Sequence, residues 1–164
     1  MRHKLDSIDR NILVVLQKDG RLSNTQLAER VGLTPAPCLR RVRALEEAGV
    51  IQKYAALVDS HALALGVTVF AQVTLDKQVK DQLEVFEQSV GKWPEVMDCY
   101  LMTGDSDYLL RIVLPDVEAY ERFLNEALTQ VPGVASIKSS FALRQVKYST
   151  ALPLIPEETD RQPA

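Results

Sequence analysis

The chain has 164 residues, of which 46% are hydrophobic and 25% charged, a composition typical of globular proteins. No apolar run approaches the roughly 18 to 20 residues of a membrane span, and the charged start MRHKLDSIDR lacks the apolar core of a secretory signal. The two cysteines have no spacing typical of a disulfide framework or a metal site. We therefore expect a cytoplasmic protein without a metal or another cofactor.

Charge is distributed unevenly along the chain. Residues 1–53 carry ten Lys or Arg side chains and six Asp or Glu, whereas residues 54–164 carry nine and sixteen, for a net charge of −3. A uniformly acidic surface would repel nucleic acid, but here the positive charge is concentrated in the N-terminal third. This asymmetry favours a DNA-binding N-terminal segment.

The first predicted helix begins after Asp6 or Ser7, either of which can cap its amino end, and it ends near Gly20. Spacings of i, i+4, i+7 and i+8 place four apolar residues on one face of this helix. They are Ile8, Ile12, Val15 and Leu16. Such a helix supplies the third helix that a small DNA-binding domain needs.

Two further helix starts follow, on either side of Gly32, in the pattern of a helix-turn-helix. Ser23 can cap the first helix and Gly32 can end it. Thr34 can cap the second helix, with Pro35 at its first position and Gly49 at its end. The expected buried residues are Leu27, Ala28 and Val31 in the first helix and Leu39, Val42 and Leu45 in the second.

In such a motif the second helix enters the major groove, where its first residues meet base edges while nearby cations contact phosphates. Thr34, Ala36, Pro37 and Arg40 occupy the base-reading positions, and Ala36 can meet a thymine methyl group. The other predicted DNA-binding residues are Arg21, Ser23, Arg41, Arg43 and Lys53. The alternative is an ordinary helical hairpin whose arginines are merely solvated.

From Gly66 the pattern becomes β-α-β-β-α-β, which is typical of a ferredoxin-like sheet with both helices on one side. The uncovered face of such a sheet is a natural dimerisation surface. Trp93-Pro94 is expected to end the first of these helices, Asp116 to cap the second, and residues 104–107 to connect the central hairpin. The expected elements are strands 67–74, 96–103, 108–114 and 134 to about 148, and helices 81–90 and 117–130.

These patterns divide the chain into four segments. They are a helix-turn-helix DNA-binding domain (1–53), a hinge strand or linker (54–65), a ferredoxin-like dimerisation domain (66–150) and a C-terminal tail (151–164). The predicted fold class is α+β, with an N-terminal winged-type helix-turn-helix head and a C-terminal ferredoxin-like βαββαβ domain.

Four segments resemble the Lrp/AsnC family, the leucine-responsive and asparagine-responsive transcription regulators of bacteria and archaea. They are LDSIDRNILVVLQKDGR, LAERVGLTPAPCLRRVRALEEAGVI, TGDSDYLLRI and VPGVASIKSSFALRQVKYSTALPL, and they follow the family's order over nearly the whole chain. The resemblance implies a DNA-binding head and an effector domain that forms dimers, often assembled into octamers, with an amino acid bound between neighbouring dimers. The expected partners are double-stranded DNA, an amino-acid effector and further copies of the chain.

A free amino acid needs an anionic acceptor for its ammonium and N–H or hydroxyl donors for its carboxylate. In the loop 103–107, Asp105 and Asp107 are acceptors and Gly104 admits close backbone approach, and the resemblance aligns these three residues with the family's effector loop. The remaining predicted effector residues are Thr103, Ser106, Tyr108, Ser139 and Ser140. Ser106 departs from the bulky aromatic of many relatives. The alternative is a solvated hairpin turn.

The sequence thus favours a sequence-specific transcriptional regulator of amino-acid metabolism that responds to an amino acid bound between dimers. The serious alternative is a DNA-organising protein that needs no effector and has low sequence preference. An enzyme is disfavoured, because the chain has no recognisable nucleotide-binding, metalloprotease or catalytic-triad motif and only two histidines for acid–base chemistry.

Overall fold

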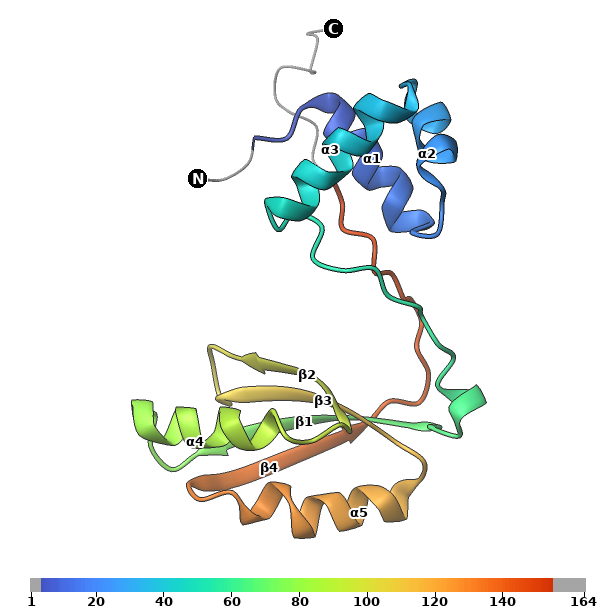
Figure 1. Cartoon of the computed structure of the whole chain (residues 1–164). Helices are drawn as coiled ribbons and strands as arrows, with labels where there is room; N and C mark the ends of the chain where they lie inside the picture. Colours follow the sequence, from blue (N-terminus) through green and yellow to red (C-terminus); the bar gives the residue numbers. More distant parts are fainter. Residues whose placement is uncertain (1–3, 155–164) are drawn as a thin grey trace, which may run out of the picture. The chain divides into compact units, whose positions relative to one another are not determined.

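The computed structural model describes residues 4–154, and Figure 1 shows its helices and strands. The contacts between residues divide the chain into two compact units. The first, which we call the head, joins the N-terminal residues up to Leu57 with the C-terminal residues from Lys147. The second, which we call the sheet unit, is Val58–Val146. Each unit has its own hydrophobic core.

The N-terminal helices of the head are α1 (Ser7–Lys18), α2 (Asn24–Val31) and α3 (Pro35–Glu47). Asp6 caps α1 and Ser23 caps α2, each in a capping box with the residue three positions further on. Gly32 ends α2 in the left-handed conformation, with φ at +70°. These caps and this turn confirm the prediction. Thr34 differs, because it has the extended backbone of a cap residue but makes no side-chain cap bond.

The core of the head is built from six buried side chains: Ile12, Leu13, Leu27, Ala28, Cys38 and Leu45. The prediction that Leu39 faces this core was wrong, since its side chain is 38% exposed. Steps of three residues drift around a helix of about 3.6 residues per turn. Cys38, Val42 and Leu45 therefore form the core-facing line of α3, and Leu39 lies beside it.

The C-terminal segment completes the head. The N–H of Leu152 donates to Gln17 Oε1 over 2.6 Å, and Gln17 Nε2 donates to the Leu152 carbonyl over 3.2 Å. Leu154 packs against the same core as the three helices. These contacts fasten a segment that follows the last strand to the first helix of the chain. The rest of the predicted tail, residues 155–164, lies outside the described residues.

The linker after the head has little regular structure. Residues 52–59 form neither helix nor strand, and a 3-10 turn covers His61–Leu63. A strand needs a neighbouring strand to pair with its backbone N–H and C=O groups. Within residues 4–154 no strand pairs with residues 52–59, so the predicted hinge strand is not formed there. Tyr54 fastens the start of the linker to α3, because its hydroxyl donates to Glu46 at 2.9 Å. Burial and this hydrogen bond raise the pKa of Tyr54 to about 12.

The elements of the sheet unit are β1 (Val67–Leu75), α4 (Lys80–Val90), β2 (Val96–Leu101), β3 (Tyr108–Leu114), α5 (Val117–Glu126) and β4 (Val134–Phe141). The strands lie in the order β2-β3-β1-β4, and each neighbouring pair is antiparallel. This is the predicted ferredoxin-like arrangement. Asp116 caps α5 as predicted, accepting from the N–H of Ala119 at 2.6 Å.

The first helix of the sheet unit ends at Val90, as predicted, whereas the second ends earlier than the sequence predicts. The C-cap of α4 is Gly91, so the helix has already ended before Trp93-Pro94. Ala127 leaves the helical conformation at φ −121° and ψ −66°, which ends α5 and leaves a short 3-10 turn where the helix was expected to continue. In α5 one local backbone change therefore ends the helix, although the sequence remains apolar at Leu128.

Two strands are also shorter than predicted. β4 ends at Phe141 rather than near Tyr148, because its partner β1 begins opposite this point. The N–H of Ala142 makes a last hydrogen bond, to the carbonyl of Thr68 at 2.9 Å. β2 ends two residues before its predicted limit, at Leu101. Strand length here depends on the available partner and not on local propensity alone.

The two faces of the sheet differ. Alternate side chains of β1 and β3 are buried in one core with Phe86 of α4 and Tyr120 of α5, so both helices cover the same face (Figure 1). No helix of the sheet unit covers the other face. Its apolar residues are Phe70, Tyr100, Leu109 and Val113.

Candidate DNA-reading helix and effector loop

A hydrogen bond from α2 fixes the start of α3. The side-chain amide of Asn24 donates to the carbonyl of Pro35 over 2.7 Å. Thr34, Ala36 and Arg40 are exposed, and they lie in or before the first turns of α3. This is where a second helix of the motif meets base edges. The role of Asn24 was not predicted, because nothing in the sequence distinguishes this asparagine from a solvated one.

Arg41 differs from the other predicted DNA-binding arginines because its guanidinium pairs with carboxylates within the head. Its Nη1 lies 2.7 Å from Asp6 Oδ2 and 2.8 Å from Asp9 Oδ1, so it pairs α3 with the N-terminal end of α1. A hydrogen bond from the Asp9 N–H, with those from Arg41, lowers the pKa of Asp6, and the two carboxylates raise the pKa of Arg41. We therefore expect Arg41 to contribute to the stability of the head, and its contact with DNA stays a prediction.

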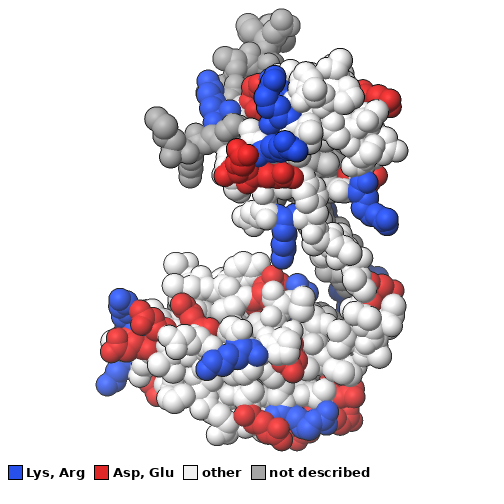
Figure 2. Space-filling view, viewed as in Figure 1, with Lys and Arg blue, Asp and Glu red and all other residues white. Residues whose placement is uncertain are grey.

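The other predicted DNA-binding residues differ in how available they are. Arg21, Arg43 and Lys53 are exposed, and none makes an ion pair within residues 4–154. The Ser23 hydroxyl oxygen accepts its cap bond from the N–H of Gln26, and Pro37 is half-buried. Figure 2 shows basic and acidic side chains side by side on the visible face of the head. The cations there do not form one continuous patch.

The predicted effector loop connects β2 to β3 and is exposed at Thr103, Gly104 and Asp105. The φ of Gly104 is +126°, and a residue with a side chain would be strained in this backbone conformation. The Asp105 carbonyl accepts from Thr74 Oγ1 at 3.5 Å, while its carboxylate makes no hydrogen bond or ion pair within the described residues. Ser106, next to it, is half-buried. The loop thus presents a free carboxylate beside accessible backbone.

Asp107, the second predicted acceptor, has a different role. Asp107 is only 3% exposed. Its carboxylate accepts hydrogen bonds from the N–H of Leu75 at 2.7 Å and from the side-chain amide of Gln78. Its own N–H donates to the carbonyl of Val73 at 2.9 Å. These contacts tie the loop to the end of β1. The Asp107 carboxylate is therefore turned into the protein and holds the loop.

Tyr108 and the two predicted serines of β4 lie away from the loop surface. Tyr108 is buried, its hydroxyl donates to Glu87 at 2.9 Å, and burial raises its pKa. Ser139 and Ser140 point to opposite faces of the sheet because successive strand residues alternate. Ser139 shares a 2.5 Å hydrogen bond with Tyr120. A single chain does not bring all the predicted effector residues into one site.

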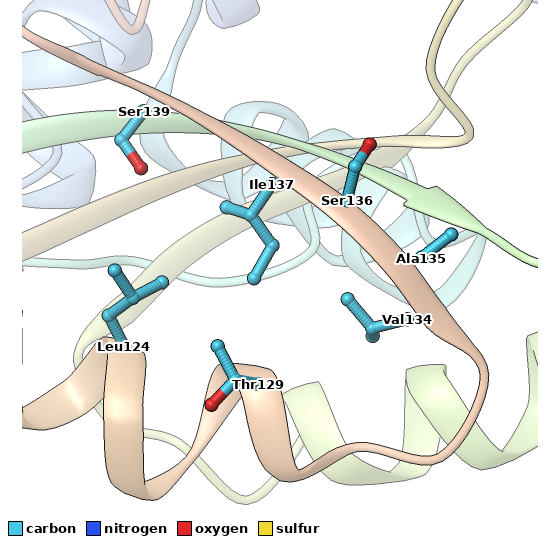
Figure 3. A pocket seen from close by; sticks show the side chains of 7 residues that line it. All are labelled: Leu124, Thr129, Val134, Ala135, Ser136, Ile137 and Ser139. Carbon is cyan, nitrogen blue, oxygen red and sulfur yellow. The ribbon is translucent and has the colours of Figure 1, made fainter.

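A cavity of about 290 Å³ opens between β4 and the end of α5. Its lining combines apolar side chains with three hydroxyl groups: Leu124, Thr129, Val134, Ala135, Ser136, Ile137 and Ser139. Figure 3 shows Leu124, Val134 and Ile137 pointing into the space between strand and helix, whereas Ser136 points away. Of these residues only Ser139 was among the predicted effector residues, because the others follow the ordinary pattern of a strand and a helix.

Residues 4–154 contain no group of three or more His, Cys, Asp or Glu side chains placed to hold a metal ion. The same residues contain no helix with the length and apolar character needed to cross a membrane. Cys99 is half-buried, and burial together with Glu87 raises its pKa to about 11. Its thiol is therefore protonated at neutral pH and is not an activated nucleophile.

Comparison with known proteins finds a matching family for each of the two units. A model of the Lrp/AsnC ligand binding domain matches residues 68–152, and a model of winged helix-turn-helix DNA-binding domains matches residues 5–52. The chain belongs to the Lrp/AsnC family. It is a DNA-binding transcription regulator with a ligand-binding domain, and the predicted α+β fold is confirmed.

Relatives of known name and structure agree with this family. The leucine-responsive regulatory proteins of Klebsiella pneumoniae and Escherichia coli K12 are each 47% identical over 148 residues, which cover 90% of this chain and 90% of theirs. A Neisseria meningitidis transcriptional regulator, solved as an L-Met complex, is 45% identical with a TM-score of 0.88 and covers 92% of this chain and 97% of its own. An Agrobacterium tumefaciens AsnC family regulator is 40% identical, with a TM-score of 0.87 and coverages of 91% and 97%.

Proposed function

We propose that this Lrp/AsnC regulator binds specific operators through α3 and controls genes of amino-acid metabolism in response to an amino acid. The observation that carries the effector role is the Asp105 carboxylate, which is exposed and unbonded within the described residues, in a loop that Asp107 holds in place. An α-ammonium group needs such an acceptor. The exposed backbone of residues 103–105 supplies N–H donors for the carboxylate of the ligand.

The proposed effector is an apolar α-amino acid. The relatives at 47% identity are leucine-responsive, and the Neisseria meningitidis structure is an L-Met complex. Four of the seven residues that line the cavity beside β4 are apolar, and the effector loop contacts the end of β1 through Thr74. Both are open in the single chain, which supports a ligand position where two copies meet.

Dimerisation through the uncovered face of the sheet is part of this proposal. Phe70 is 38% exposed and Tyr100 is 56% exposed in the single chain, and a second sheet would remove both from water. Further assembly of dimers, up to octamers, would bring effector loops together. An effector changes DNA affinity only as far as it prefers one assembly over another, an effect usually worth about 5- to 150-fold.

The effector role is tested by thermal shift. The full-length protein should melt at a higher temperature with one chemical group of amino acids among the twenty, because a ligand of the native state stabilises it. Asp105→Asn removes the negative charge that pairs with the ammonium group and should abolish the shift. Glu121→Gln, which removes an exposed carboxylate on α5, should keep it. A protein that no amino acid stabilises at millimolar concentration would instead fit an effector-independent DNA-organising protein.

The two exposed arginines of α3 should differ in their effects on DNA binding. Arg40→Ala, near the start of the helix, should reduce discrimination between operator and random DNA, since base contacts are worth about 1–3 kcal/mol each. Arg43→Ala should weaken both DNAs alike and lower the salt slope by about one, as expected for one phosphate contact. Fluorescence anisotropy titrations at several salt concentrations measure both quantities. The reverse pattern would exchange the two assignments.

A further inference from the structure

An exposed leucine lies among the arginines of α3. Leu39 is 38% exposed, whereas the adjacent Cys38 is wholly buried. A shallow depression on the solvent side of the helix has six lining residues: Ala36, Leu39, Arg40, Arg43, Ala44 and Glu47. Because Cys38, Val42 and Leu45 already supply the core contacts of α3, Leu39 is free to contact a partner on the surface of the head.

The surroundings of Leu39 fit the major groove of DNA better than an apolar protein surface. Arg40 and Arg43 are exposed close to it on α3, and neither makes an ion pair within the described residues. Leu39 therefore lies beside Arg40, which we assign to a base edge, and Arg43, which we assign to a phosphate. The apolar group that bases present in the major groove is the 5-methyl group of thymine.

We propose that Leu39, together with Ala36 one turn earlier, reads thymine through its 5-methyl group. The operator would then contain a thymine opposite the middle of α3, recognised by apolar contact instead of a hydrogen bond. This inference rests on the proposed sequence-specific DNA binding. It adds a specificity-determining residue that the sequence analysis had assigned to the core.

The test removes the methyl group from the DNA. Duplexes that the full-length wild type enriches from a random-sequence pool are resynthesised with deoxyuridine in place of each thymidine in turn. Binding of the wild type should weaken about fourfold at the thymine that Leu39 contacts, roughly the value of one buried methyl group. Leu39→Ala should bind the unmodified duplex about as weakly and should no longer respond to deoxyuridine at that position.

Val14→Ala is the matched control, because Val14 on α1 is 39% exposed and lies on another helix of the same head. This variant should respond to deoxyuridine like the wild type, and melting curves should show all three proteins equally folded. The inference is overturned if Leu39→Ala keeps the full deoxyuridine response, or if deoxyuridine at no position weakens binding of the wild type. It is also overturned if Leu39→Ala loses self-association in the absence of DNA. If no duplex is enriched at all, sequence-specific binding itself fails, which is a separate result.

Discussion

Replacing Arg41 with alanine should destabilise the head. The guanidinium contacts Asp6 and Asp9 at 2.7 and 2.8 Å, and the Asp9 side chain is 8% exposed. Breaking a fully buried pair costs roughly 3 to 5 kcal/mol, and we expect about 2 kcal/mol here because the Arg41 side chain is 32% exposed. Hydrogen exchange of the backbone amides of α1 and α3 in the full-length protein measures this loss without requiring the two units to unfold together.

Arg43→Ala is the control, since Arg43 lies on the same helix and makes no ion pair in the part of the chain that the structure describes. It should leave amide protection unchanged and weaken DNA binding. If Arg41→Ala instead keeps full protection and reduces DNA affinity as Arg43→Ala does, Arg41 contacts phosphate in solution and its ion pairs contribute little.

Asp107→Ala should destabilise the sheet unit and remove the response to the effector. The carboxylate accepts from the buried N–H of Leu75 at 2.7 Å and from Gln78, so its loss leaves a backbone donor unsatisfied and frees the loop from β1. Hydrogen bonds to charged groups contribute roughly 1.5 to 3 kcal/mol each, and we expect a total loss of about 3 kcal/mol. Thermal melting with and without the amino acid identified in the screen measures both effects.

Asp105→Ala distinguishes the role of Asp105 from that of Asp107. It removes an exposed carboxylate with no partner among the described residues, so the melting temperature without ligand should stay within a degree or two of the wild type. The ligand-induced shift should disappear in both variants. An Asp107→Ala protein that melts like the wild type would show that this carboxylate does not hold the loop.

The local rules of helix formation explain why much of the fold was predictable. Asp6, Ser23 and Asp116 cap helices through contacts within three residues of chain, and Gly32 needs only its own backbone freedom. Alternation along the strands likewise follows from the sequence alone. The end of β4 was not predictable in this way, because it depends on a remote partner, the start of β1.

The candidate site was less predictable for the same reason. Asp105 and Asp107 are the same residue type two positions apart, and what distinguishes them is the Leu75 amide, 32 residues away from Asp107 in sequence. Arg41 and Arg43 look equivalent in the sequence until Asp6, 35 residues from Arg41, is placed beside one of them. Residue type predicted what each group can bind, and the fold decided which of them is already bound.

The head is assembled from two separate stretches of chain, because Leu152 hydrogen-bonds to Gln17, 135 residues earlier, and Leu154 packs against the core of the head. A single break in the linker therefore leaves each fragment with part of the same unit. In evolution or in design, this DNA-binding module cannot be moved to another sensor domain by one crossover in the gene. The exchange requires two junctions, one in the linker and one after β4, so we expect the two units to be inherited together.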